Sequence, residues 1–236
     1  MYEGEFAGIY DHIHSSRGKD YRAEAKELER LIRTRRPDAS SVLDVACGTG
    51  GHLVPLRDLF DRVEGLDPSP DMLAIAGRRV PRATLHRGDM RDFAIGGSFD
   101  AIVCMFSSIG YLSTVEELNE TLARFVHHLT PGGVIVIEPW VFPEKFTPGY
   151  VATDLARVEG RSIARFSHSA REGDTTRMEV HYLDADASGI RHLTDVHRLR
   201  LFTEAAYRAA FRQAGCSVEY VADDGFPRGA FVGVSK

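Results

Sequence analysis

Residues 41–51, Ser-Val-Leu-Asp-Val-Ala-Cys-Gly-Thr-Gly-Gly, constrain the fold of this chain more than any other stretch. An apolar strand that contains Asp44 runs directly into a turn with Gly48 and Gly50, after which a helix is expected to begin. Glycine has no Cβ, so its backbone can adopt a positive φ and let a ligand lie against it. At the carboxyl end of a parallel strand, this pattern predicts a binding site for a nucleotide-like cofactor.

The pattern does not favour a dinucleotide. Dinucleotide-binding turns carry a third glycine five positions after the first, and that position here is Leu53. Asp44 also precedes the turn, where its charge would repel a pyrophosphate but attract a cationic amino-acid group. We therefore expect Asp44, Ala46, Gly48 and Gly50 to bind a cofactor that contains an amino-acid moiety.

Further acidic residues follow the next two predicted strands. Asp67 ends the strand 63–67 and lies 23 residues after Asp44, the spacing at which a βαβ unit presents an acceptor to ribose hydroxyls. In Gly88-Asp89-Met90, the acid can accept from an exocyclic amine and Met90 can pack on a purine face. Two further candidates for cofactor binding are Tyr21, whose ring can face a cationic group, and Met105.

Over about residues 40–139, the chain resembles the class I S-adenosylmethionine-dependent methyltransferases. The resemblance depends on the combination of the strand, the acid, the glycine turn, the second acid and Gly-Asp-Met. The resemblance implies an α/β fold with a doubly wound, mostly parallel, Rossmann-like sheet. It also implies S-adenosylmethionine as the cofactor and S-adenosylhomocysteine as the product.

The composition is that of an ordinary globular chain. Of its 236 residues, 43% are hydrophobic and 27% charged, and no apolar run approaches the roughly 20 residues needed to cross a bilayer. The first five residues lack the basic and apolar regions of a signal peptide, and the three cysteines do not form an even disulfide set. We expect a cytoplasmic protein without a membrane partner.

Charge and histidine spacing disfavour two other classes of enzyme. The formal net charge of −5 argues against a nucleic-acid partner, because binding to a phosphate backbone draws on a basic surface. The ten histidines include no Glu-spaced pair, and adjacent His127 and His128 would point to different faces of a helix. We therefore expect no metal site.

Strands and helices alternate through most of the chain, which predicts a parallel sheet. The hydrophobic pattern predicts helices at 2–14, 21–37, 50–60, 69–79, 114–129 and 203–214, and strands at 42–46, 62–66, 83–86, 99–105, 134–138, 216–221 and 229–235. Between residues 140 and 201 the pattern changes to a period of two, as in 161–168 and 177–182, which predicts antiparallel strands. We expect a cofactor-binding core at 1–139 and 202–236, with covering helices at its amino terminus, and a substrate-binding β insert at 140–201.

A second resemblance runs nearly from end to end. Its motifs are Met1-Tyr2-Glu3-Gly4, Gly18-Lys19-Asp20-Tyr21, Gly88-Asp89-Met90-Arg91-Asp92-Phe93, Cys104-Met105-Phe106-Ser107-Ser108-Ile109-Gly110-Tyr111-Leu112, Glu138-Pro139-Trp140, Ser167-His168-Ser169, Arg177-Met178-Glu179 and Arg228-Gly229-Ala230-Phe231. These are similar to motifs of the bacterial N,N-dimethyltransferases that act on dTDP-linked amino sugars, of the desosamine and mycaminose type in macrolide pathways. The resemblance implies that a nucleotide-sugar amine is methylated in the biosynthesis of an antibiotic, and it is compatible with a homodimer.

The resemblance also assigns substrate-binding and catalytic residues. Arg228, with help from the insert, would hold the diphosphate, because an arginine fork matches phosphate oxygens. The expected substrate-binding residues are Ser107, Trp140, Arg165, Ser167, His168, Arg177 and Arg228, and the expected catalytic residues are Tyr2 and Tyr111.

One residue departs from the family pattern. A histidine follows Ser-Ser-Ile-Gly in the desosamine and mycaminose enzymes, whereas this chain has Tyr111. A phenol with a pKa of about 10 is suited to orienting an amine rather than to taking its proton. The change leaves the position of the amine open between C3 and C4 of the sugar. Methylation of a sugar hydroxyl or of another small metabolite is the alternative, and a cofactor-binding protein without activity is disfavoured by the intact set Asp44, Asp67 and Asp89.

Overall fold

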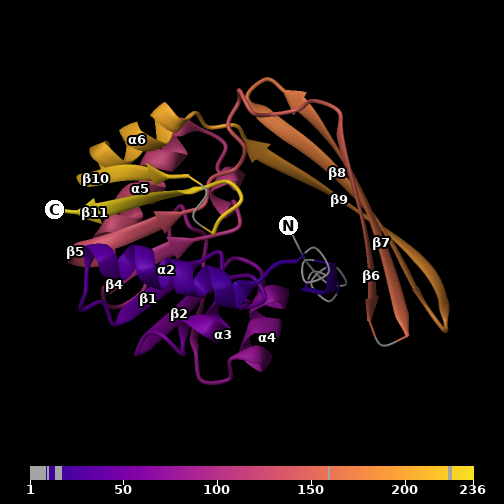
Figure 1. Cartoon of the computed structure of the whole chain (residues 1–236), viewed down its shortest axis with the longest axis horizontal. Helices are drawn as coiled ribbons and strands as arrows, with labels where there is room; N and C mark the ends of the chain where they lie inside the picture. The colour runs from indigo at the N-terminus through magenta and orange to yellow at the C-terminus, as the bar shows by residue number, and fades with distance from the viewer. Residues whose placement is uncertain (1–8, 10, 14–17, 159, 223–224) are drawn as a thin grey trace.

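In the computed structural model, the chain forms one sheet of seven strands and one of four (Figure 1). The structure describes residues 9, 11–13, 18–158, 160–222 and 225–236. The larger sheet has the order β10-β11-β5-β4-β1-β2-β3, and β11 is its antiparallel strand. Its strands are β1 (Ser41–Val45), β2 (Arg62–Asp67), β3 (Thr84–Arg87), β4 (Phe99–Cys104), β5 (Leu129–Ile137), β10 (Cys216–Val221) and β11 (Ala230–Ser235). This order confirms the predicted doubly wound, mostly parallel sheet.

Helices cover both faces of the larger sheet (Figure 1). One face carries α2 (Tyr21–Arg35), α3 (Leu53–Leu56) and α4 (Pro70–Arg79), and the other carries α5 (Val115–His127) and α6 (Glu204–Gln213). Side chains of β1 alternate between two hydrophobic cores: Leu43 and Val45 belong to the core of α5 and α6, and Val42 belongs to the core of α2. Burial on both faces explains why β1 and β4 are mostly apolar, with Ser41, Asp44 and Asp100 as buried polar exceptions.

The helix predicted at 50–60 is much shorter in the structure. Regular helix spans Leu53–Leu56, flanked by turns, although Phe60 N–H still donates to the carbonyl of Leu56. The physical reason is Pro55, which has no N–H to donate to the preceding turn. The strand predicted at 134–138 is longer in the structure, where β5 spans Leu129–Ile137.

The smaller sheet is an antiparallel meander of β6 (Tyr150–Val158), β7 (Arg161–Glu172), β8 (Thr175–Asp186) and β9 (Gly189–Arg200). The stretches 161–168 and 177–182, predicted as antiparallel strands, lie within β7 and β8. Figure 1 shows this sheet standing beside the end of the larger one. Its inner face buries Ile163, Val180 and Tyr182, and its outer face is exposed.

The described part of the amino-terminal segment packs between the two sheets. Of the helix expected at 2–14, the structure describes 9 and 11–13, which are helical. Ile9 and Ile13 pack against the inner face of the smaller sheet, while Asp11 accepts a hydrogen bond from Thr49 and pairs with Arg79 at 2.5 Å. No helix in the described part of the chain is long and apolar enough to cross a membrane.

Candidate active site

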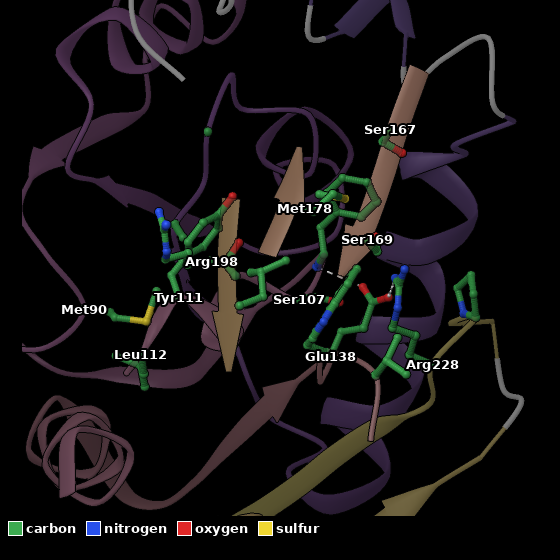
Figure 2. A pocket seen from close by; sticks show the side chains of 18 of the residues that line it. Met90, Ser107, Tyr111, Leu112, Glu138, Ser167, Ser169, Met178, Arg198 and Arg228 are labelled. Atoms are coloured by element: carbon green, nitrogen blue, oxygen red, sulfur yellow. Dashed lines mark hydrogen bonds and ion pairs between the residues drawn. The ribbon is translucent and has the colours of Figure 1, made fainter. Parts of the chain in front are cut away.

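A cavity of about 820 Å³ lies between the carboxyl end of the larger sheet and the inner face of the smaller one. Its floor is the point where the strand order reverses between β1 and β4, the position at which open α/β sheets bind ligands. Residues of the larger sheet, of the smaller sheet and of the loops between them line this one cavity (Figure 2). It therefore has room for a cofactor and a second ligand side by side.

The glycine turn after β1 borders the cavity and is held by Asp67. The Gly48 N–H donates to Oδ2 of Asp67 at 2.9 Å, and the Ser69 N–H donates to Oδ1 at 2.9 Å. Gly48 has a φ of +54°, and a Cβ built there would meet no heavy atom within 4 Å, so its backbone faces open space. Burial raises the pKa of Asp67, against the hydrogen bonds from Ser69 and Gly48.

Asp44 lies behind the glycine turn with its carboxyl buried. Its side chain is 1% exposed, and Oδ2 has no hydrogen-bond partner among the residues that the structure describes. Burial, reinforced by the charge of Asp67, raises the pKa of Asp44 to about 8. A buried carboxyl without a full set of partners next to an open backbone loop fits a cationic ligand group.

The loop after β3 brings Asp89 and Met90 to the cavity wall. Asp89 accepts hydrogen bonds from Arg91 Nε at 2.8 Å and Arg91 Nη2 at 2.7 Å, and this pairing lowers the pKa of its carboxyl. Met90 is largely buried, with its thioether at the edge of the cavity in Figure 2. A carboxylate suits the exocyclic amine of a purine, and the flexible, polarisable thioether of Met90 can pack against its face.

The structure divides the expected cofactor-binding residues into two groups. Those that line the cavity are Ala46, Gly48, Asp67, Asp89 and Met90. Tyr21, Asp44, Gly50 and Met105 do not line it. Tyr21 packs its ring directly on Gly51, where a Cβ would lie 2.6 Å from the ring, and it borders a second, smaller cavity.

Sequence reasoning missed Lys19, which also lines the cavity. Its side chain is 8% exposed, and Nζ lies 2.8 Å from Glu24 and 4.1 Å from the centroid of the Phe106 ring. Glu24 accepts a second hydrogen bond from His52 Nε2 at 2.7 Å if that nitrogen carries the proton. Lys19 lies within the motif Gly-Lys-Asp-Tyr, but a single lysine at the start of a helix gives no signal that it will be buried.

The loop after β4 is held in an unusual backbone conformation. Phe106 and Ser107 have positive φ values of 54° and 63°, as does Ala46 in the loop after β1, with 59°. Such conformations cost energy in residues other than glycine and persist only where the surroundings enforce them. Here the Phe106 N–H donates to Glu138 at 2.8 Å, and the Ser107 hydroxyl donates to the Pro139 carbonyl at 2.8 Å. The loop is thus fixed where it lines the cavity.

The inner face of the smaller sheet forms the opposite wall. Arg165, Ser167 and Ser169 alternate along β7 on this face, and Met178 of β8 lies opposite Ser169. Arg165 is 5% exposed and forms an ion pair with Asp154 at 3.1 Å. Sequence reasoning missed Ser169 and Met178, although alternation with Arg165 and Ser167 gave a signal for Ser169.

His168 and Arg177 lie on the other face of the same sheet. In β7, His168 stands between the inward-facing Ser167 and Ser169 and is exposed. Arg177 pairs with Glu179 at 2.9 Å, and neither it nor His168 lines the cavity. Successive side chains of a strand point to opposite faces, so a motif of three consecutive residues cannot place all of them in one site.

Arg228 enters the cavity from the loop before β11. Its guanidinium lies 4.6 Å from the centroid of the Trp140 ring and 3.6 Å from Oε1 of Glu138 (Figure 2). Glu138 is 1% exposed, and burial raises its pKa, while Lys19 and Arg228 oppose the rise. Trp140 is fixed in turn by a hydrogen bond from Nε1 to the Thr176 hydroxyl at 3.2 Å.

Tyr111 lines the cavity from a 3₁₀ turn, Ser108–Tyr111, after β4. Its hydroxyl lies 2.9 Å from Nδ1 of His197 in β9. Tyr111 is 42% exposed overall, but desolvation around its hydroxyl, together with the charge of Asp195, raises the pKa of Tyr111 above its ordinary value. Tyr2, the other residue expected to be catalytic, lies outside the described residues.

The fold and this cavity define a class I S-adenosylmethionine-dependent methyltransferase. A family model described as "Methyltransferase domain" matches residues 42–133, which hold the glycine turn and the acids after β2 and β3. S-adenosylmethionine is accordingly the cofactor.

The relatives of the chain narrow the class to one family. The chain is 54% identical to dTDP-3-amino-3,4,6-trideoxy-alpha-D-glucopyranose N,N-dimethyltransferase of Streptomyces venezuelae over 99% of each chain. It is 48% identical to dTDP-4-amino-2,3,4,6-tetradeoxy-D-glucose N,N-dimethyltransferase of Saccharopolyspora spinosa, over 99% of this chain and 94% of that one. The crystal structure of DesVI from Streptomyces venezuelae matches with a TM-score of 0.95 and 54% identity over 100% of both chains. The chain belongs to the dTDP-amino-sugar N,N-dimethyltransferases, as its motifs predicted.

Proposed function

We propose that this enzyme transfers two methyl groups in turn from S-adenosylmethionine to the amine of a dTDP-linked deoxyamino sugar. The observation that carries the proposal is the single cavity shared by the two sheets. One wall holds acids and a glycine turn suited to the cofactor, and the other holds hydroxyl and cationic side chains suited to a nucleotide sugar.

The cofactor would occupy the side of the cavity formed by the larger sheet. Asp67 would accept from the ribose hydroxyls, and Asp89 and Met90 would hold the adenine. Asp44, behind the turn, would stabilise the amino group, and Lys19 would face the carboxylate. The cofactor supplies a methyl group on a sulfonium, and its transfer requires mainly that the acceptor be held in line while water is excluded.

The nucleotide sugar would occupy the side formed by the insert, residues 140–201, and by Arg228. Figure 2 shows Ser167, Ser169 and Arg228 on one side of the view and Tyr111 on the other. We assign the diphosphate to Arg228 and the serines, because a guanidinium and hydroxyls together satisfy phosphate oxygens. Arg198, which also lines the cavity and is exposed, adds positive charge near Tyr111.

The acceptor amine must lose a proton before it can attack. An ammonium has no lone pair, and a neighbouring sulfonium in a poorly hydrated cavity lowers the pKa of the amine by like charge and desolvation. A strong base is then unnecessary, which suits a tyrosine at position 111. Tyr111 would position the amine by a hydrogen bond, and Tyr2 is assigned the same task from the family resemblance.

Mass spectrometry tests the proposal directly. The purified enzyme is incubated with S-adenosylmethionine and a panel of dTDP-3-amino and dTDP-4-amino deoxy sugars, with the matching dTDP-hydroxy sugars as controls. We expect a doubly methylated amino sugar and two equivalents of S-adenosylhomocysteine. Methylation of a hydroxy sugar, with the amino sugars unchanged, would assign the enzyme to the O-methyltransferases instead.

We further propose that the outer face of the smaller sheet pairs with a second copy of the chain. Five large exposed apolar side chains lie on this face: Val151, Leu155, Phe166, Leu183 and Ile190. Monomers rarely expose a patch of this kind, and a two-fold axis lets one patch cover itself. Light scattering after size-exclusion chromatography should give a dimer, and Phe166→Asp should give a monomer. A monomeric parent chain would exclude the assembly.

A further inference from the structure

Behind Tyr111, two residues of β9 continue a line of polar groups away from the cavity. The Tyr111 hydroxyl lies 2.9 Å from Nδ1 of His197, and Nε2 of His197 lies 3.5 Å from Oδ2 of Asp195. His197 is 1% exposed, and the Asp195 carboxylate is held in place by the Val196 N–H, which donates to its Oδ1 at 2.8 Å. His197 and Asp195 are two positions apart in one strand, so both point to the same face.

This order of groups determines the direction of the hydrogen bond between Tyr111 and His197. Burial lowers the pKa of His197, against the charge of Asp195, so its imidazole is neutral and carries one proton. A carboxylate beside Nε2 favours the tautomer with the proton on Nε2, which leaves Nδ1 as an acceptor. The Tyr111 hydroxyl must then donate to His197, and its oxygen presents its lone pairs to the cavity.

We propose that His197, held in one tautomer by Asp195, is a positioning residue that turns the Tyr111 hydroxyl so that its oxygen accepts an N–H from the substrate amine. The inference rests on the proposed function. With one N–H held by Tyr111, the amine lone pair is free to point at the methyl carbon. Tyr111 thus acts as an acceptor toward the substrate, although a phenol is usually considered a donor.

This role needs no change in the protonation of His197. The proton of the substrate ammonium passes to water, because the neighbouring sulfonium and desolvation lower the pKa of the amine. The neutral amine then forms its N–C bond while the S–C bond breaks, and the electron pair of that bond stays on sulfur. The second methyl transfer repeats these steps with a second molecule of S-adenosylmethionine.

Variants of His197 separate positioning from packing. His197→Asn keeps an acceptor oxygen near the place of Nδ1, whereas His197→Leu fills a similar volume without an acceptor. We expect His197→Leu to lower kcat about 10- to 100-fold with KM changed less than about threefold, and His197→Asn to retain most of the activity. In a Tyr111→Phe background, His197→Leu should cause no further loss, because its effect passes through the hydroxyl.

Two measurements show that these variants stay folded and bind the cofactor: the melting temperature and the Kd for S-adenosylmethionine. His192→Leu, in the same strand but on the outer face, is the matched control and should keep the parent kcat. Equal losses in His197→Asn and His197→Leu, or a full additional loss in the Tyr111→Phe background, would overturn the proposal.

The tautomer of His197 can be measured without turnover, by long-range ¹H–¹⁵N correlation spectra of the full chain. We expect the proton on Nε2 in the parent enzyme and a shifted tautomer population in Asp195→Asn. A proton on Nδ1 in the parent would overturn the inference even in an active enzyme. Failure to methylate any amino sugar, with the Nε2 tautomer present, would instead count against the proposed function.

Discussion

Binding of S-adenosylmethionine should release a proton from Asp44 at neutral pH. This carboxyl is 1% exposed, and burial with the neighbouring Asp67 raises its pKa to about 8. In the cofactor-free enzyme at pH 7, a group with that pKa is about 90% protonated. The carboxyl is thus mostly neutral until a cation arrives beside the glycine turn.

The size of the release follows from the shift that the cofactor causes. A cationic group within about 4–6 Å lowers the pKa of a carboxyl by about 1–3 units. A shift of about two units would bring Asp44 to a pKa of about 6, and about 0.8 proton would leave per cofactor bound at pH 7. At pH 9 the carboxyl is already ionised, so the release should fall to about 0.1 proton.

Isothermal titration calorimetry in buffers with different enthalpies of ionisation measures this number as a slope. Asp44→Asn should abolish the release and weaken binding, because the amide cannot become charged. S-adenosylhomocysteine keeps the amino group but lacks the sulfonium, so the same titration with this product separates the effect of the ammonium from that of the sulfonium. A binding enthalpy that does not depend on the buffer at pH 7, in an enzyme with normal affinity, would refute the assignment of Asp44 to the cofactor's amino group.

Four further predictions concern the other groups. Asp67→Ala should weaken S-adenosylmethionine binding by about 1.5–3 kcal/mol, since it removes charge-assisted hydrogen bonds, and unchanged affinity by calorimetry in a folded variant would exclude the ribose role. Arg228→Ala should raise KM for the nucleotide sugar in steady-state assays and leave the Kd for the cofactor unchanged in binding assays. If both affinities fall in parallel, Arg228 has a structural role instead. In the parent enzyme, kcat should rise with pH as the substrate amine deprotonates, and a flat profile would place the proton loss elsewhere. Burial by itself raises the pKa of Asp100, but hydrogen bonds from Ser40, Ser41 and Thr130 and the charge of Arg36 lower this pKa overall to about 2. The ionised carboxylate should therefore stabilise the fold fully above about pH 4, and this contribution should disappear as the pH falls toward 2. In urea titrations, Asp100→Asn should lower the free energy of unfolding by about 1–3 kcal/mol at pH 6 and by much less at pH 2.

The local pattern of the chain was sufficient to predict the larger sheet and to predict that Asp67 and Asp89 lie together at its carboxyl end, where both line the cavity. A strand of five buried residues, an acid and a glycine turn are contiguous in the sequence, and the right-handed βαβ connection brings successive strand ends to one edge. Asp67 and Asp89 could therefore be assigned by spacing alone. Tyr21 does not line this cavity, because its ring packs on Gly51, and helical periodicity identifies a buried face without saying what that face will contact.

His168 and Arg177, which were expected to bind the substrate, also do not line the cavity, for a related reason. Family motifs name consecutive residues, but a strand sends alternate side chains to opposite faces, so Ser167 lines the cavity while His168 does not. Lys19 and Glu138 were not predicted as site residues. Both are buried, and each charge is compensated by groups from other segments of the chain, which residue spacing does not reveal.

The sequence by itself determined the fold class, the methyl donor and the family of this enzyme, because those depend on short motifs whose residues are neighbours in the chain. Only the tertiary structure decided what Tyr111 can do. Its partner His197 is 86 residues away in another sheet, and the two meet because β9 packs against the turn after β4. The direction of that hydrogen bond depends on a third group, Asp195, and on burial, and both are properties of the folded chain rather than of any segment of it.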